Sequence, residues 1–276
     1  FLAHATAVKG KEVSARTNEG SMIKMDWIAS DEPTQLVLLK ADEWTSTASP
    51  VTISSTSAGN KGMLAITPSG PVRAERAGET YGIVNPSRRV VKLDEIRLEN
   101  NLPSLGGSLL FTMNGELAGA INAALGMSPS QNVQKIRANG DLVGGNGGAR
   151  LGPEKTLQQY GPGVLTAAYT VGTKVFNRVV AGFLSPDHTV KYPAIGIFCR
   201  DALTQTGALI DSVTKGSPAD GAGLQKGDVI YAIENQAVRT QIDFARIMAD
   251  QEIGDHIRVW IRRGGLQQMV TVEVGS

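Results

Sequence analysis

Short apolar segments separated by turn-forming residues dominate the sequence from residue 11 to about residue 122. Many such segments, with Gly, Pro, Asn, Asp or Ser at regular intervals between them, are typical of a β-barrel or β-sandwich. The N-terminal part of the chain is therefore predicted to be mainly β. The predicted strands are KEVSARTN, MIKMDWIA, QLVLLKA, PVTISS, GMLAITP, GETYGIV, RRVVKLDEI, SLLFTM and ELAGAIN.

Length and charge limit the class of protein. A chain of 276 residues can hold one large domain or two ordinary ones, and we expect two. The net charge of +1 gives no electrostatic reason to expect nucleic acid or an anionic membrane as a partner. No apolar run is long enough to span a bilayer, so we expect no transmembrane segment.

Cysteine and histidine usage argues against a metal site. Cys199 is the only cysteine, and His4, His188 and His256 are scattered without the spacing of metal ligands. These residues cannot form a thiolate metal cluster, and a disulfide within the chain is excluded. We expect neither a metal nor another cofactor.

The segment from Gly126 to Gly163 interrupts the pattern of short strands. Its glycine density, in DLVGGNGGARLG, favours a mobile surface loop inserted into the N-terminal domain. A phosphate-binding loop is the alternative, but GGNGG follows no convincing strand and lacks the Lys-Ser/Thr ending of such loops. The next segment, from Val164 to Leu184, has apolar residues at near-helical spacing and predicts an amphipathic helix.

A linker, SPDHTVKYP, precedes a C-terminal unit in which strands and short helices alternate. Within SPADGAGLQKGD, Ser217 is predicted to cap a helix, Pro218 to occupy its first position and Gly223 to end it. The predicted strands cover residues 208–213, 228–233 and 256–262, and the predicted helices cover 217–223 and 241–249. Over its whole length this unit resembles a PDZ domain of the permuted type found in HtrA-family proteases.

The PDZ resemblance implies a peptide-binding groove. The carboxylate-binding loop of such domains corresponds to Ala194-Ile195-Gly196-Ile197, whose backbone amides would bind the C-terminal carboxylate of a ligand, and a side chain at Gly196 would obstruct this carboxylate. The peptide would then add as a strand beside Ile197, Phe198 and Cys199. Phe244, Ile247 and Met248 are candidates for the opposite wall, and the alternative for each is a place in the domain core.

The N-terminal part is similar to the trypsin-like domain of the same family, in which a hairpin follows the nucleophile turn. Asn114-Gly115-Glu116 matches the tip of that hairpin and Ile121-Asn122 matches the strand after it. Counting back from the tip aligns residues 104–108 with the turn, so Gly106 takes the position of the nucleophilic serine. Ser104 or Ser108 could replace it only if the turn were displaced.

The other two members of the catalytic triad are assigned by the same resemblance. Residues 1–6, FLAHAT, resemble the segment around the catalytic histidine, which makes His4 the base or its remnant. Residues 34–39, TQLVLL, resemble the strand that the triad aspartate opens, and Gln35 takes the aspartate position. An acyl-enzyme needs a nucleophilic atom, which glycine lacks, and a neutral amide cannot offset the charge of an imidazolium.

The resemblance therefore implies a mainly β fold, with a trypsin-like double β-barrel that is incomplete at its N-terminus (residues 1–189, including the insertion at about 126–163) and a PDZ domain (residues 190–276). We expect the full-length protein to be longer at its N-terminus. The preferred function is a non-proteolytic HtrA-like adaptor, chaperone or scaffold for protein quality control, which binds C-terminal or unfolded peptides. The alternatives are an active endopeptidase using Ser104 or Ser108, and a structural oligomerisation platform. The family implies a periplasmic or cell-envelope location and a possible homo-trimer.

Overall fold

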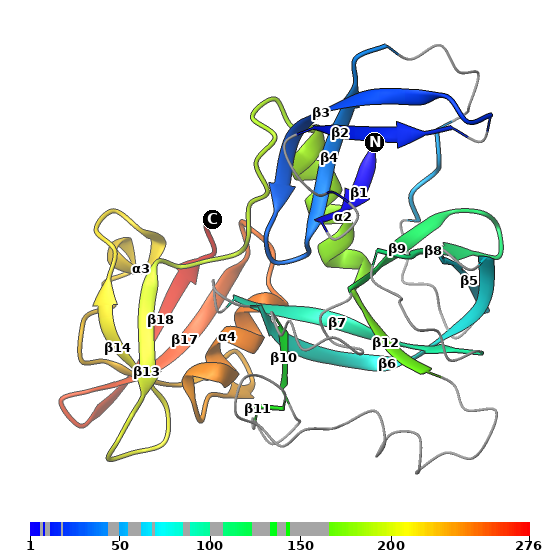
Figure 1. Cartoon of the computed structure of the whole chain (residues 1–276). Helices are drawn as coiled ribbons and strands as arrows, with labels where there is room; N and C mark the ends of the chain where they lie inside the picture. Colours follow the sequence, from blue (N-terminus) through cyan, green and yellow to red (C-terminus); the bar gives the residue numbers. More distant parts are fainter. Residues whose placement is uncertain are drawn as a thin grey trace. The chain divides into compact units, whose positions relative to one another are not determined.

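The computed structural model divides into two compact units, one that ends at Val190 and one that begins at Lys191 (Figure 1). The structure describes residues 1–5, 8, 12–17, 19–43, 50–54, 62–67, 70–84, 89–99, 107–122, 133–136, 142–143 and 166–276. Ser104, Gly106 and most of the insertion at 126–163 lie outside these residues.

A four-stranded antiparallel sheet opens the first unit. Its strands are β1 (Leu2–His4), β2 (Val13–Arg16), β3 (Met22–Asp31) and β4 (Leu36–Ala41), in the order β1-β4-β3-β2. Among the described residues of this sheet, Met25, Val37 and Leu39 form a small buried cluster, with partly buried small and β-branched side chains around them. The sheet is a half-barrel.

The second sheet of this unit closes on itself. Strands β6, β5, β8, β9, β12 and β7 are hydrogen-bonded in this order, and the additional β6–β7 pairing joins the two ends. Closure leaves no open edge in this ring, which is how small β-barrels bury their backbone groups. The bounds are β5 (Met63–Thr67), β6 (Gly70–Val84), β7 (Arg89–Leu98), β8 (Leu109–Thr112), β9 (Leu117–Asn122) and β12 (Thr166–Val171).

Two regions of this barrel differ from the sequence-based prediction. The predicted helix from Val164 to Leu184 is wrong in its first part, because residues 166–171 form β12 between β7 and β9, and helix α2 (Thr173–Leu184) begins only after Gly172. Two short strands also lie within the insertion, where only a loop was predicted. These are β10 (Val133–Ile136), which pairs with β6, and β11 (Leu142–Val143), which pairs with β10.

The predicted hairpin is confirmed. Strands β8 and β9 pair antiparallel around the turn at residues 113–116, where Gly115 has a φ of +81° that suits glycine. Helix α2 packs its apolar face inward through Val175, Phe176 and Val179, all buried. The chain after α2 passes close to the end of this helix. A Cβ added to Gly182 would lie only 2.8 Å from Val190 Cα.

The second unit is a six-stranded sheet with two short helices. Its strands are β13 (Ile197–Asp201), β14 (Ala208–Val213), β15 (Val229–Ile233), β17 (His256–Arg263) and β18 (Leu266–Glu273) in this order, with β16 (Gln236–Ala237) beside β15. The helices are α3 (Pro218–Gly221) and α4 (Gln241–Ala249). Strand β13 forms one edge of the sheet.

Local sequence signals act as predicted in this unit. Ser217 caps α3 by accepting a hydrogen bond from Asp220 N, and Pro218 occupies the first turn of the helix. A partly buried ion pair not predicted from the sequence joins distant segments: Arg263 Nε and Nη2 donate to the two carboxylate oxygens of Asp228, both at 2.7 Å. Asp228 is 1% exposed, so this bidentate pair fixes the β15–β17 end of the sheet.

Candidate functional site

His4 is buried at the end of β1, opposite Leu36 of β4. Burial disfavours the charged imidazolium and lowers the pKa of His4 from 6.5 to about 4. The residue is therefore neutral at physiological pH. A general base is also neutral before it acts, so its role depends on whether a neighbouring group stabilises the imidazolium that forms.

Gln35 immediately precedes Leu36, the residue that pairs with His4. Its carbonyl oxygen accepts a hydrogen bond from Ala5 N at 2.7 Å, and its backbone has a φ of +59°, in the left-handed region. A tight turn produces this conformation, because Thr34 donates both its N–H and its hydroxyl to the buried carboxylate of Asp31. The structure thus places Gln35 in the turn that leads into β4, next to the end of β1 where His4 lies.

The side chain of Gln35 contributes no charge at this point. Its Oε1 atom is buried and has no hydrogen-bond partner among the described residues. A neutral amide there cannot stabilise an imidazolium, whereas a carboxylate in the Ser-His-Asp arrangement does so.

Ser108 lies just before β8 in a closed backbone arrangement. Gly107 N donates to Ile121 O at 3.0 Å, and Ser108 O accepts from Ile121 N at 2.8 Å. Ser108 is 3% exposed, and its Oγ is buried with no partner within the described part of the chain. A hydroxyl enclosed in this way is poorly placed to attack a substrate.

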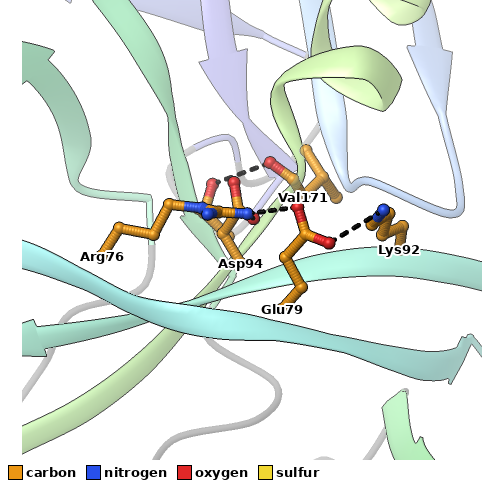
Figure 2. A network of polar contacts seen from close by, with 6 residues as sticks. Arg76, Glu79, Lys92, Asp94 and Val171 are labelled. Atoms are coloured by element: carbon orange, nitrogen blue, oxygen red, sulfur yellow. Dashed lines mark hydrogen bonds and ion pairs between the residues drawn. The ribbon is translucent and has the colours of Figure 1, made fainter. Parts of the chain in front are cut away.

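A second polar cluster of the first unit lies across β6, β7 and the end of β12 (Figure 2). Arg76 Nη2 donates to Asp94 Oδ1 at 2.7 Å and contacts Glu79, and Lys92 Nζ lies 2.9 Å from Glu79 Oε2. A bulge in β6 between Arg76 and Gly78 allows Arg76 to reach both carboxylates. Two cations and two anions balance, and hydrogen bonding to Lys92 lowers the pKa of Glu79. Each of these four charged groups therefore has a partner of opposite sign within the network.

The candidate groove of the second unit begins at the loop before β13. Ile195 is buried in the core, and Gly196 has a φ of +79°. Thr214 N donates to Gly196 O, and Ala219 N donates to Ile195 O, so both carbonyls are held by the domain. The amides of Ile195 and Gly196 donate to no backbone carbonyl in the part of the chain that the structure describes. They are therefore available to an acceptor such as a carboxylate.

One hydrogen bond shows which N–H and C=O groups of β13 point to the open edge of the sheet. Because Thr214 N donates to Gly196 O, the paired residues Ile197 and Val213 form a pair without hydrogen bonds between them. The N–H and C=O groups of Ile197 consequently point to the open edge of the sheet. Those of Cys199 point the same way, since the direction alternates along a strand. An extended peptide can pair there.

Side chains divide between the two faces of β13. Ile197 and Cys199 pack against the core, and burial raises the pKa of the Cys199 thiol to about 12. Phe198 points away from the core and is 69% exposed. Of the predicted wall residues on α4, Ile247 and Met248 are buried in the core cluster, whereas Phe244 is only partly buried against it. Phe244 is thus the one of the three with surface left for a ligand.

The glycine of the loop is required by the domain itself. A Cβ on Gly196 would lie 2.2 Å from Ser217 Cβ and 2.6 Å from Ser217 Oγ. The positive φ adds a backbone penalty for any other residue. A larger side chain would therefore disturb the Ser217 helix cap as well as any bound carboxylate, and Gly196→Val does not separate binding from folding.

Two residues that were not predicted from the sequence to shape the groove hold it in place. Asp201, at the end of β13, accepts a hydrogen bond from Gln241 N at 2.7 Å and so joins β13 to the start of α4. Ser217 donates to Gly196 O at 3.4 Å and caps α3. The SPAD segment gave a signal for Ser217 as a helix cap, whereas Asp201 lies 40 residues from its partner and gave none.

A family model described as a PDZ domain matches residues 193–274, which include the loop, β13 and α4 described above. The C-terminal unit is a PDZ domain. PDZ domains bind peptides by strand addition at the edge of a sheet, and β13 supplies such an edge here.

Sequence relatives extend the match into the first unit. The chain is 28% identical over 148 residues to a protein named as putative serine protease HhoB from Synechocystis sp., which corresponds to 51% of this chain and 35% of that protein. It is 25% identical over 174 residues to a protein of Marinomonas sp. named as a DegP-like periplasmic serine endoprotease, over 56% of this chain and 37% of that protein. The chain thus covers only about a third of either relative.

Solved structures show the fold of the whole chain. The structure of the HtrA-type protease AlgW with decapeptide matches 99% of this chain and 78% of its own, with a TM-score of 0.58 and 17% identity. The first unit has the HtrA-type serine endopeptidase fold, with a half-barrel and a closed barrel resembling trypsin-like proteins, and the PDZ domain follows it.

The described residues hold no group of three or more His, Cys, Asp or Glu side chains that could bind a metal ion. Among the same residues, no helix has the length and apolar content needed to cross a membrane.

Proposed function

We propose that this chain belongs to a non-proteolytic HtrA-like protein, which binds the C-termini of other proteins or unfolded peptides through its PDZ domain and serves as an adaptor, chaperone or scaffold. The observation that carries the proposal is the site around His4. His4 is buried at the end of β1, and Gln35, which by the resemblance drawn above takes the aspartate position, is a neutral amide that cannot offset the charge of an imidazolium.

Two further features support the loss of proteolysis. Ser108, the candidate nucleophile within the described residues, is enclosed by protein. By the resemblance drawn above, Gly106 takes the place of the serine and supplies no atom for an acyl-enzyme. The alternative function, an active endopeptidase with Ser104 or Ser108 as the nucleophile, is favoured by the names of the relatives.

Peptide binding rests on the PDZ domain. The open edge of β13, the available amides of the loop and the partly buried side chains of Ile197 and Phe244 together provide a strand to pair with, donors for a carboxylate and apolar surface. We expect micromolar affinity for peptides with apolar ends, which corresponds to about 8 kcal/mol. A platform that only oligomerises would bind no such peptide. An extracytoplasmic location and a homo-oligomer, for example a trimer, are part of the proposal.

A fluorophosphonate probe tests the central part of this proposal, because it reacts covalently with activated serines. The full chain should remain unlabelled, and casein incubated with it should stay intact. Labelling that disappears in Ser104→Ala or Ser108→Ala, but not in a control such as Ser212→Ala on β14, would establish the endopeptidase instead.

A further inference from the structure

We infer that the outer face of β13 selects the ligand through Phe198 and Arg200, which favour an apolar penultimate residue and an acidic residue at the fourth position from the peptide's C-terminus. This inference rests on the proposed peptide site and deepens it. It concerns the side chains that point away from the groove, whereas Ile197 and Cys199 point towards the core.

The register of a bound peptide follows from the backbone of β13. Its carboxylate would be held by the loop at residues 194–197, so the peptide must run antiparallel to β13 and end beside Ile197. Counting along the two strands places the terminal residue opposite Ile197 and the penultimate residue opposite Phe198. The fourth residue from the end then lies opposite Arg200.

Residues directly opposite each other in such a pair have Cβ atoms about 5 Å apart and point to the same face of the sheet. The penultimate side chain therefore lies next to Phe198 on the outer face. That phenylalanine is 69% exposed, because its partner on β14 is the small, exposed Ser212. An apolar or aromatic penultimate residue would cover part of its ring, whereas a serine would not.

Charge complementarity sets the second preference. Arg200 is exposed and donates from Nε to Asp211 Oδ1 at 2.8 Å. A guanidinium has five N–H donors, so its two terminal amino groups can bind a second carboxylate while this contact persists. Asp211 reaches Arg200 because it is the extra residue of the β-bulge in β14. An acidic side chain at the fourth position meets this guanidinium.

The test uses fluorescently labelled peptides with one apolar C-terminal residue and measures their binding to the full chain by anisotropy. The penultimate residue is Trp or Ser, and the fourth from the end is Glu or Gln. We expect Trp over Ser, and Glu over Gln, each to tighten binding by about two- to fivefold, as expected for one favourable cross-strand pair. Phe198→Ser should abolish the first preference alone, and Arg200→Gln the second alone.

Leu203→Ser provides the matched control, since Leu203 is 87% exposed and follows the end of β13, beyond the positions opposite the last four peptide residues. It should keep both preferences. Equal affinity of the Trp and Ser peptides for the unchanged protein, or a preference that survives Phe198→Ser, overturns the inference. So does a change in oligomeric state caused by Phe198→Ser, because another protein surface would then cover the ring.

The inference and the peptide site fail in distinguishable ways. If peptides bind through their free carboxylate without regard to the two outer positions, the groove is correct and the outer-face selection is wrong. If amidated peptides bind as tightly as free acids, the carboxylate does not anchor the peptide, and both ideas are wrong.

Discussion

Acidification should destabilise the first unit through His4. The pKa of His4 is about 4 in the folded protein, compared with 6.5 for an exposed histidine. The unfolded chain therefore takes up a proton more readily, so the stabilising contribution of the neutral form is complete above pH 6.5 and is lost as the pH falls towards 4. Linkage over this window gives a loss of about 2 kcal/mol in unfolding free energy between pH 7 and pH 5.

Urea unfolding at a series of pH values measures this loss. In a Trp260→Phe background the two remaining tryptophans, Trp27 and Trp44, both belong to the first unit and report on it alone. His4→Gln should remove most of the pH dependence, because glutamine does not titrate. His256→Gln is the matched control, since His256 is exposed in the PDZ domain, and it should leave the dependence unchanged.

Proton NMR of the histidine ring gives the pKa itself. A His4 pKa at or above 6.5, or equal pH dependence in His4→Gln and the unchanged protein, would refute the reasoning. Such a result would mean that a negative charge stabilises the imidazolium, as in a working catalytic triad.

Three further predictions concern single substitutions. Gln35→Asp should raise the pKa of His4 towards or above 6.5 in the same NMR titration, because it adds a carboxylate beside a buried imidazole, and an unchanged pKa would show that residue 35 does not face the ring. Gly106→Ser alone should leave casein intact in an overnight digestion, since loss of the triad carboxylate lowers the rate of trypsin by a factor on the order of 10⁴, and rapid cleavage would contradict this. Asp228→Asn should lower the unfolding free energy of the PDZ domain by roughly 2 to 3 kcal/mol, because it weakens a bidentate pair whose carboxylate is buried, whereas Asp211→Asn at an exposed pair should cost less than about 1 kcal/mol.

Local signals in the sequence were sufficient for part of the fold. The Asn114-Gly115 turn and the Ser217-Pro218 helix start depend on backbone conformations that these residues favour by themselves, and both are present. Residues 166–171 were assigned to a helix because their apolar spacing continues that of α2. Pairing with β7 and β9 makes them a strand, and the partners of that pairing lie far away in the sequence.

In the candidate groove, too, local features could be predicted from the sequence and long-range contacts could not. The carboxylate loop could be aligned from the sequence, but periodicity alone could not separate Phe244, which is partly buried, from Ile247 and Met248, which fill the core. The Asp201 contact with Gln241 and the Asp228 pair with Arg263 join residues that are 40 and 35 positions apart. Such contacts depend on the folded chain and leave no local pattern.

Peptide binding without cleavage is the central claim, and one experiment tests it directly. A labelled peptide with an apolar free C-terminus and its amidated twin are each titrated with the full chain, and the peptide is then recovered and its mass measured by mass spectrometry. We predict that the free acid binds with micromolar affinity, that the amide binds much more weakly, and that both peptides are recovered intact. Equal binding of the two forms, or recovery of cleaved peptide, would contradict the account.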